Sequence, residues 1–302
     1  MSEKSRLARQ RNSKSVTIKS YASAVKPTWC PGCGDYGIMT AIKTALVSLN
    51  IAPHQALIVT GIGCGSKTPD YMHINGFLSI HGRPLPVATG AKLANHALTV
   101  LVVDGDGDAY GIGGNHLIHT MRRNLDITHI VQNNQVYALT KGQYSPTSAH
   151  GTITTTSPDG VIEVPLRPLL LGLTMGATFL ARGFAGEPRH LADILIEAIR
   201  HRGYALVDVL QPCVTFNKVN TYDWYREHTY KVEQEGHDPT DFEAAFRRCR
   251  EWEDRIPLGI LYRKEGTPTY EDQVPALRQG PLVHQPLDRR AHDFEALKNK
   301  FT

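Results

Sequence analysis

Leu98-Thr-Val-Leu-Val-Val-Asp-Gly-Asp-Gly-Asp108 is the stretch of sequence from which the fold can be worked out. Its first six residues are mostly β-branched or aliphatic, which is typical of a buried strand, and glycines alternating with aspartates follow. Comparable short apolar runs lie at Ala56–Thr60, Ile127–Gln132 and Ala205–Leu210. We therefore expect at least four buried strands.

Helices are expected between these strands. Gly34–Asn50 and Leu191–Ile199 carry apolar residues every three or four positions, which is the spacing of an amphipathic helix. Strands that alternate with helices pair in parallel, with helices on both faces of the sheet. The sequence therefore predicts a doubly wound parallel α/β sheet.

The residues that follow the predicted strands are more informative than the strands. They are Gly61-Ile-Gly-Cys-Gly65, Gly105-Asp-Gly-Asp108, Asn133-Asn134 and Pro212-Cys213. In open α/β sheets the ligand lies beyond the carboxyl ends of the strands. We therefore expect these glycines, carboxylates, amides and thiols to gather at one edge of the sheet.

The acidic glycine motif does not match two common ligand-binding loops. An EF-hand loop would need glycine where Ala109 stands and glutamate where Asn115 stands. A dinucleotide-binding fingerprint would need glycine in place of Tyr110. Both of these alternatives are excluded.

A thiamine diphosphate signature does fit, because Asn134 follows Asp106 by 28 residues and each residue ends a predicted strand. Mg²⁺ prefers hard oxygen ligands, here the Asp106 carboxylate, the Asn134 amide oxygen and the Val136 carbonyl. Glycines let backbone N–H groups approach a diphosphate closely. The pattern indicates a site that binds Mg²⁺ and thiamine diphosphate together.

The chain has five cysteines, an odd number that does not favour a disulfide framework. Cys30, Cys33, Cys64 and Cys213 are expected at the same sheet edge, where four thiolates hold either zinc or a [4Fe–4S] cluster. The spacing does not separate these two alternatives. Cys249 lies in a charged late segment and is interpreted as an ordinary free thiol.

Composition bounds the class of protein. The 302 residues are 41% hydrophobic and 21% charged, as expected for a globular chain. The net charge of +4 comes from residues 1–15, so the body is neutral and a nucleic-acid-binding face is not expected. No apolar run reaches the about 20 residues that span a bilayer, and a cytoplasmic protein is expected. We predict a disordered basic tail (1–15), an α/β domain (16–255) and an irregular C-terminal extension (256–302).

A set of motifs in order resembles the β subunit of 2-oxoacid:ferredoxin oxidoreductases. The resemblance runs from about Pro27 to the region of Tyr230, less firmly to about residue 270, and excludes the tails. The motifs are Trp29-Cys-Pro-Gly-Cys-Gly34, Gly61-Ile-Gly-Cys64, His81-Gly-Arg-Pro84, Ala88-Thr-Gly-Ala-Lys92, Gly105-Asp-Gly-Asp108, Asn133-Asn-Gln-Val-Tyr137 and Leu139-Thr-Lys-Gly-Gln143.

The resemblance implies a role for particular residues. Those implied to bind the cluster are Cys30, Cys33, Cys64 and Cys213, and those implied to bind Mg²⁺ are Asp106, Asn134 and the carbonyl of Val136. Those implied to contact thiamine diphosphate are Ile62, Gly63, Cys64, Gly65, His81, Gly105, Gly107, Asp108, Ala138 and Leu139. Lys67 is implied to act in catalysis near the substrate carboxylate, and Lys141 to lie in a loop that selects the substrate.

The implied activity is a coenzyme A-dependent oxidative decarboxylation of a 2-oxoacid to acyl-CoA and CO₂. Electrons pass through the [4Fe–4S] cluster to ferredoxin, and the reaction reverses if the carrier is reducing enough. Thr140-Lys141-Gly142 resembles the broad-specificity and 2-oxoglutarate members of the family more than the pyruvate type, and 2-oxoglutarate is the favoured substrate. A non-redox thiamine decarboxylase with a structural zinc, an electron-transfer subunit without catalysis, and pyruvate as substrate stay open as alternatives.

The sequence offers no candidate for the glutamate that activates thiamine diphosphate. Activation of the cofactor requires a glutamate on its pyrimidine ring, and no glutamate here can be assigned to that role. In the family it comes from a partner α subunit, or from a fused γ–α chain. The resemblance therefore implies half of a shared site, in an α₂β₂ assembly.

Overall fold

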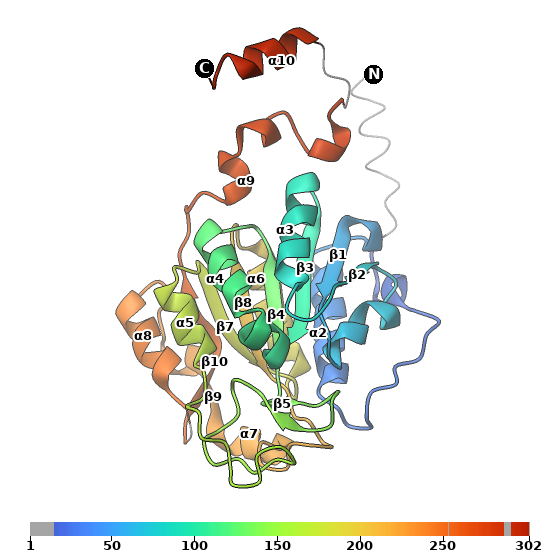
Figure 1. Cartoon of the computed structure of the whole chain (residues 1–302). Helices are drawn as coiled ribbons and strands as arrows, with labels where there is room; N and C mark the ends of the chain where they lie inside the picture. Colours follow the sequence, from blue (N-terminus) through green and yellow to red (C-terminus); the bar gives the residue numbers. More distant parts are fainter. Residues whose placement is uncertain (1–14, 253, 287–290, 302) are drawn as a thin grey trace.

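The computed structural model describes residues 15–252, 254–286 and 291–301. Its main strands are β1 (Ala56–Thr60), β2 (Asn75–Leu78), β3 (Thr99–Gly105), β4 (Thr128–Asn133), β7 (Phe179–Phe184), β8 (Ala205–Leu210), β9 (Thr229–Lys231) and β10 (Ile256–Arg263). Its α-helices are α2 (Asp35–Ser48), α3 (Pro84–Ala94), α4 (Gly114–Arg123), α5 (Pro168–Thr174), α6 (Pro188–Arg200), α7 (Tyr222–His228), α8 (Phe242–Arg250), α9 (Tyr270–Gln273) and α10 (Ala291–Lys298). The eight strands form one sheet in the order β2-β1-β3-β4-β8-β7-β10-β9, with helices on both sides (Figure 1).

Two helical layers cover the sheet, and the strands supply apolar side chains to both. Ile58, Leu101 and Val103 pack with α2 and α6 on one face. Val59 and Val102 pack with α3, α4, α5 and α8 on the other. Successive strand residues point to opposite faces, so strands buried on both sides read as continuous apolar runs. The predicted doubly wound α/β fold is confirmed.

The predicted strands agree closely with the structure. β1 and β8 have the predicted bounds, and β4 is shifted by one residue. β3 continues to Gly105 because Asp104 and Gly105 still pair with β4. A π-helical turn, Gly107–Ile112, and α4 then lead across to β4.

The prediction of an irregular extension from residue 256 is wrong for its first eight residues. Ile256–Arg263 form β10, which pairs antiparallel with β7 and parallel with the short β9. Pro257 and Gly259 weaken the strand pattern in the sequence. Gly259 is required because its φ is +125° and an added Cβ would lie 2.7 Å from Val232 and Glu233 side-chain atoms. The α/β sheet therefore continues to Arg263.

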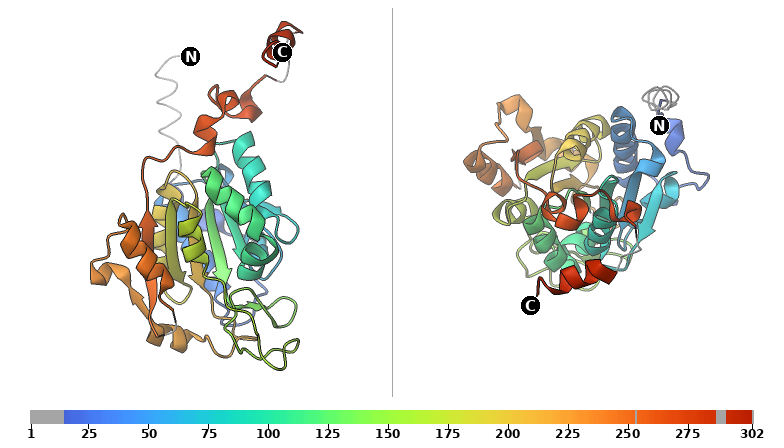
Figure 2. Two further views of the ribbon diagram at one scale, coloured as in Figure 1. Left: turned by 60° about the vertical axis from the view of Figure 1, so that its left-hand side comes forward. Right: turned by 90° about the horizontal axis from the view of Figure 1, so that it is seen from above.

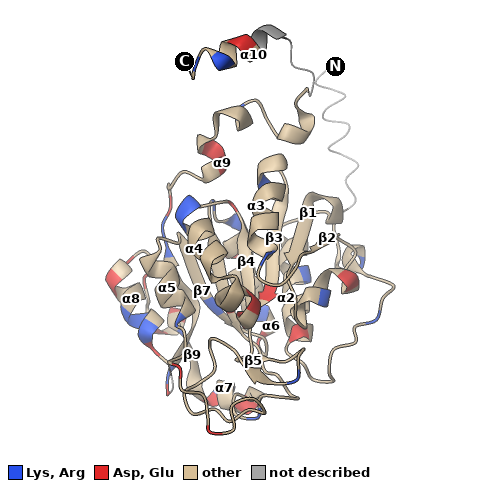
Figure 3. Cartoon of the chain, viewed as in Figure 1, with Lys and Arg blue, Asp and Glu red and all other residues tan. Residues whose placement is uncertain are grey.

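The two ends of the sheet differ. The loop that carries β5 (Val136–Tyr137) and β6 (Gln143–Tyr144) lies with α7 at the carboxyl ends of the parallel strands, whereas α9 and α10 lie beyond the opposite end (Figures 1 and 2). Acidic and basic residues are interspersed in the view of Figure 3. Among the described residues, no helix combines the length and apolarity needed to cross a bilayer. The predicted basic tail lies outside the described residues, apart from Ser15.

Candidate active site

The carboxyl ends of β1, β3 and β4 meet around a cavity of about 280 Å³, which we call the thiamine cavity. Every residue implied to contact thiamine diphosphate or Mg²⁺ lines it: Ile62, Gly63, Cys64, Gly65, His81, Gly105, Asp106, Gly107, Asp108, Asn134, Val136, Ala138 and Leu139. Gln132, Tyr137 and Thr140, to which the sequence assigned no role in binding thiamine diphosphate or Mg²⁺, complete the wall. The sheet edge predicted from the strand ends is therefore a real concavity.

Asp106 lines this cavity and is 2% exposed. One carboxylate oxygen, Oδ2, accepts hydrogen bonds from Ser145 Oγ at 2.5 Å and from Thr147 Oγ1 at 2.6 Å. Burial raises the pKa of Asp106 to about 6, although these hydroxyls lower it. A buried carboxylate with one oxygen already satisfied is suited to give the other oxygen to a cation.

Asn134 is held in one orientation by its neighbours. Its Nδ2 donates to Gln211 Oε1 at 2.8 Å, and its Oδ1 accepts from the Val136 amide at 3.1 Å. Thr147 links Asn133 to Asp106, because its hydroxyl also contacts Asn133 Oδ1 at 2.9 Å. Asp106 is therefore joined to Asn133, the residue before Asn134, and both predicted Mg²⁺ side chains are held by buried hydrogen bonds.

Glycines are required where backbone and side chains crowd this cavity. An added Cβ on Gly107 would lie 2.1 Å from the Tyr137 ring, and Tyr137 donates its hydroxyl proton to the Gly107 carbonyl at 3.1 Å. An added Cβ on Gly61 would lie 1.5 Å from Asp108 Oδ2. The glycines of both motifs therefore exclude side chains from the space around the cavity.

Asp108 and His81 form one wall of the cavity. His81 Nδ1 lies 2.5 Å from Asp108 Oδ1, which also accepts a hydrogen bond from the Gly82 amide at 2.6 Å. Burial, with the nearby charge of Asp104, raises the pKa of Asp108 to about 6. This contact holds the imidazole in the wall of the cavity.

A second cavity, of about 220 Å³, brings together the four cysteines predicted to bind metal, and we call it the cysteine cavity. Cys30, Cys33, Cys64 and Cys213 line it. Burial raises the pKa of Cys64 to about 11, with further effects from the charges of Asp35, Cys213 and Cys30. Within the described ranges, no three Cys, His, Asp or Glu side chains are grouped to hold a single metal ion.

The two cavities adjoin one another. Cys64, Asn134, Ala138 and Leu139 line both. Trp29 supports the shared wall, because its Nε1 donates to the Cys64 carbonyl at 2.8 Å. A group held by the cysteines and a group held at the thiamine cavity would therefore be neighbours.

The fifth cysteine is separate, as predicted. Cys249 lies in α8, is 1% exposed and packs in the apolar layer that contains α5 and α8. It does not line the cysteine cavity.

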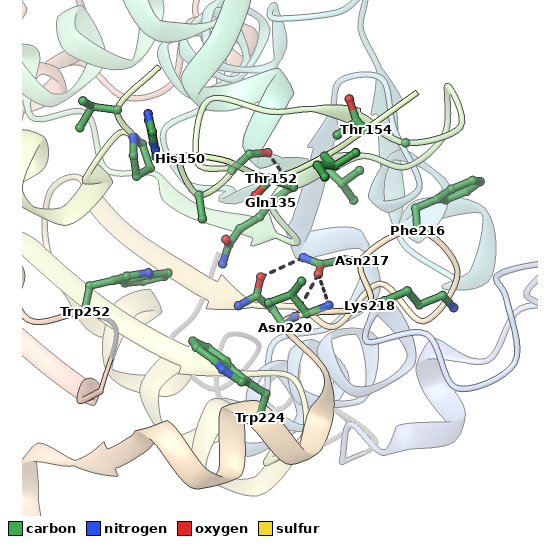
Figure 4. Close-up of a pocket in the computed structure, with 18 of the residues that line it drawn as sticks. Gln135, His150, Thr152, Thr154, Phe216, Asn217, Lys218, Asn220, Trp224 and Trp252 are labelled. Carbon is green, nitrogen blue, oxygen red and sulfur yellow. Dashed lines mark hydrogen bonds between the residues drawn. The ribbon is translucent and has the colours of Figure 1, made fainter. Parts of the chain in front are cut away.

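Both predicted substrate lysines line the cysteine cavity. Lys67 Nζ donates to Thr28 Oγ1 at 3.4 Å. Lys141 is exposed, has a φ of +78°, and also lines a larger pocket of about 1030 Å³ (Figure 4). Phe216 borders the same two spaces, and Val136 joins the larger pocket to the thiamine cavity. The larger pocket therefore adjoins both cavities.

Several residues of the site were not foreseen. Ser145 and Thr147 lie in a polar Gly/Thr/Ser-rich stretch that gives no sign of a buried hydrogen-bonding role. Gln211 directly follows β8 and precedes Pro212-Cys213, so the rule that ligands lie at strand ends could have identified it.

The fold and the site define a thiamine pyrophosphate enzyme. Residues 59–209 match the family model described as "Thiamine pyrophosphate enzyme, C-terminal TPP binding domain". Residues 213–279 match the model of the C-terminal part of the pyruvate ferredoxin oxidoreductase beta subunit.

Relatives narrow this class. The chain is 43% identical over 287 residues to 2-oxoacid:ferredoxin oxidoreductase 1, subunit beta, of Aeropyrum pernix, covering 90% of each chain. It is 47% identical over 199 residues to 2-oxoglutarate oxidoreductase subunit KorB of Mycobacterium tuberculosis, covering 66% of this chain and 53% of that protein. The protein belongs to the β subunits of 2-oxoacid:ferredoxin oxidoreductases, as the sequence motifs predicted.

A solved structure is similar throughout. The 2-oxoglutarate:ferredoxin oxidoreductase from Magnetococcus marinus, with 2-oxoglutarate, coenzyme A and succinyl-CoA bound, matches with a TM-score of 0.88 and 37% identity. The match covers 95% of this chain and 97% of that chain.

Proposed function

We propose that this chain is the catalytic β subunit of a 2-oxoglutarate:ferredoxin oxidoreductase. The reaction is the coenzyme A-dependent oxidative decarboxylation of 2-oxoglutarate to succinyl-CoA and CO₂, reversible with a sufficiently reducing ferredoxin. The observation that carries the proposal is the wall shared by the thiamine and cysteine cavities. It supports a direct exchange of electrons between an organic cofactor and a metal cluster.

The thiamine cavity offers the oxygen ligands that Mg²⁺ prefers: the Asp106 carboxylate, the Asn134 amide and the Val136 carbonyl. Burial of the Asp106 charge is unfavourable by itself, as its raised pKa shows, and a divalent cation would compensate for it. Thiamine diphosphate, when bound, supplies the electron sink for loss of CO₂. The remaining wall residues would exclude water, and His81 would face the cofactor with its imidazole fixed by Asp108.

The cysteine cavity fits a [4Fe–4S] cluster held by Cys30, Cys33, Cys64 and Cys213. Burial raises the thiol pKa of both Cys33 and Cys64, so their thiolates need nearby positive charge. Iron would supply that charge, and Cys30, which is exposed, would hold the cluster from the solvent side, from which ferredoxin could accept electrons. A cytoplasmic location would keep the thiols reduced.

Substrate recognition is assigned to Lys67 and Lys141, which line the cysteine cavity next to its wall with the thiamine cavity. An ammonium group attracts a carboxylate, and 2-oxoglutarate has two carboxylates where pyruvate has one. The KorB relatives and the solved structure with 2-oxoglutarate bound favour the dicarboxylate. Coenzyme A would approach through the larger pocket, which Lys141 borders.

A partner α subunit would complete the site. Around the thiamine cavity, Ile62 is 41% exposed, Leu139 47%, Ile112 56% and Ile80 72%. Ile80 and Gly82 flank His81 in the sequence. Ile112 lies against Gly82, because an added Cβ on Gly82 would lie 2.4 Å from an Ile112 methyl group. An exposed apolar rim is typical of a protein interface. The α subunit would bury this rim and supply the activating glutamate, in an α₂β₂ assembly.

An anaerobic assay of the co-purified α and β subunits tests the proposal. Viologen reduction with coenzyme A should be faster with 2-oxoglutarate than with pyruvate, and iron, sulfide and an EPR signal should indicate one [4Fe–4S] cluster per β chain. Zinc in place of iron, with CO₂ release but no viologen reduction, would establish a non-redox decarboxylase instead. Preference for pyruvate would overturn the substrate assignment alone.

A further inference from the structure

We propose that Gln211 is a positioning residue that links the metal ligand Asn134 to the cluster ligand Cys33. The inference rests on the proposed function, since it assigns Asn134 to Mg²⁺ and Cys33 to a cluster. Gln211 directly follows β8 and is 2% exposed. Its side chain lines the cysteine cavity, and neither the motifs nor the residue roles implied by the family include it.

The two ends of the Gln211 amide face the two sites. Its Oε1 accepts from Asn134 Nδ2 at 2.8 Å, and its Nε2 donates to Cys33 Sγ at 3.3 Å. An amide rotated by 180° would present Nε2 to the Asn134 N–H group and Oε1 to the sulfur, and both hydrogen bonds would be lost. The hydrogen bond to Cys33 therefore fixes which end of the Gln211 amide faces Asn134, and the hydrogen bond from Asn134 fixes which end faces Cys33.

Backbone contacts hold Gln211 in place. The backbone N–H group of Gln211 donates to the Asn133 carbonyl at 3.0 Å. Gly34 leaves room for its aliphatic stem, since a Cβ there would lie 2.7 Å from Gln211 Cγ. The Gly34 amide also donates to the Pro212 carbonyl at 3.3 Å. The turn that carries Cys33 is therefore attached to the strand end that carries Gln211.

Each hydrogen bond has a separate chemical consequence. Donation by Asn134 Nδ2 leaves its Oδ1 as the oxygen available to a cation, so Gln211 orients a metal ligand. Donation to the Cys33 sulfur stabilises negative charge on the thiolate, and the reduced cluster carries one more negative charge than the oxidised one. Gln211 should therefore raise the reduction potential of the cluster.

Two substitutions separate these effects. Gln211→Met keeps the length of the side chain but makes neither hydrogen bond. Gln211→Glu, as a carboxylate, still accepts from Asn134 but cannot donate to Cys33, and it adds a negative charge beside the cluster. The wild type and Gln211→Glu should therefore bind Mg²⁺ more tightly than Gln211→Met. The cluster potential should instead be highest in the wild type, lower in Gln211→Met and lowest in Gln211→Glu.

The measurements are made on the anaerobic α–β complex. Mg²⁺ affinity is measured by isothermal titration in the presence of thiamine diphosphate, and the potential by EPR-monitored redox titration. Gln211→Met should bind Mg²⁺ about 10–100-fold more weakly. Its reduced-to-oxidised cluster ratio should fall about tenfold at a fixed ambient potential, which is about 59 mV for one electron.

Thr215→Val is the matched control. Thr215 Oγ1 donates to Cys30 Sγ at 3.2 Å, and this hydroxyl makes no hydrogen bond to Asn134 in the described part of the chain. This variant should lower the cluster potential and leave Mg²⁺ affinity unchanged, whereas Gln211→Met should change both. If Gln211 had a purely structural role, the Mg²⁺ affinities and the cluster potentials of its two variants would not follow the predicted orders.

Two outcomes separate this inference from the proposed function. A wild-type complex without a [4Fe–4S] signal would overturn both the function and the role of Gln211. A wild-type complex with the signal, and a Gln211→Met variant with unchanged potential and unchanged Mg²⁺ affinity, would overturn the role of Gln211 alone.

Discussion

Removal of the Asp106 carboxylate should strongly weaken cofactor binding and, at the same time, stabilise the metal-free protein. Its Oδ2 accepts two hydrogen bonds, from Ser145 and Thr147, and the proposed function assigns its other oxygen to Mg²⁺. Asp106→Asn keeps the size of the side chain and an oxygen acceptor but removes the charge. Loss of a charged metal ligand should weaken retention of Mg²⁺ and thiamine diphosphate by on the order of 100-fold or more.

The stability effect has the opposite sign. Burial raises the pKa of Asp106 from 3.8 to about 6 in the folded protein, so the unfolded chain ionises first as the pH rises. The free-energy cost of ionising Asp106 in the folded state grows between pH 3.8 and about pH 6, and it reaches its full value above about pH 6. A shift of about two pKa units corresponds to about 3 kcal/mol, which Asp106→Asn relieves at pH 7.5.

The assay combines two measurements on the co-purified complex. Thiamine diphosphate and Mg²⁺ are quantified after desalting, and the thermal midpoint is measured in EDTA. We expect cofactor loss and a midpoint that rises by a few degrees, with Asp106→Ala also losing cofactor but gaining less stability, because it lacks the acceptor for the two hydroxyls. Wild-type cofactor retention would refute the metal assignment, and a clearly lower midpoint for Asp106→Asn would refute the argument from burial.

Four further predictions concern the cysteines, a lysine, the isolated β chain and the apolar rim. Cys213→Ala should lose most of its iron while Cys249→Ala keeps it, by iron and sulfide analysis; equal loss in both variants would exclude the four-cysteine assignment. Lys67→Met should raise KM for 2-oxoglutarate about 10–100-fold, the value of a charge-assisted hydrogen bond, and an unchanged KM would remove Lys67 from the substrate site. The isolated β chain should show no turnover, and Ile80→Asp should weaken its association with the α subunit in gel filtration, whereas Phe242→Asp, on the exposed side of α8, should not. Full activity of the isolated chain would contradict a shared site.

Most of the sheet could be predicted because its central strands are buried on both faces. β1, β3, β4 and β8 lie side by side in the sheet, and each contains consecutive apolar residues that stand out in the sequence, although polar residues such as His129 in β4 and Asp208 in β8 accompany them. β7 is not among the predicted strands although it is buried throughout, because Arg182 and Gly183 interrupt its apolar residues. The strands at the margins also give weaker signals. β2 has exposed residues throughout, and β10 contains a proline and a glycine. The error at residue 256 thus has a physical origin, since pairing with β7 and β9 overrides the local preference of the segment.

The cavities could be predicted to the extent that their residues follow strand ends. Asp106, Asn134 and Cys213 obey that rule, and the structure places all three at the expected edge. Ser145 and Thr147 do not, because the loop after β6 folds back over Asp106 and only the tertiary structure shows this contact. The polar composition of that loop excludes it from the apolar core. The same polar side chains supply the hydrogen-bond donors that a buried carboxylate needs.

The position of Cys64 explains why both cofactors would depend on one short turn. Cys64 follows β1 by four residues, lines both cavities, and precedes Gly65, which also lines the thiamine cavity. A Cβ on Gly65 would lie 1.6 Å from Gln132 Oε1, so this turn is packed against β4 without free space. One backbone segment therefore fixes the separation of the cysteine cavity from the thiamine cavity. Because close packing transmits displacement, a change at Gly65 should disturb cluster and thiamine binding together, whereas a change at Cys30, on the exposed side, should affect the cluster alone.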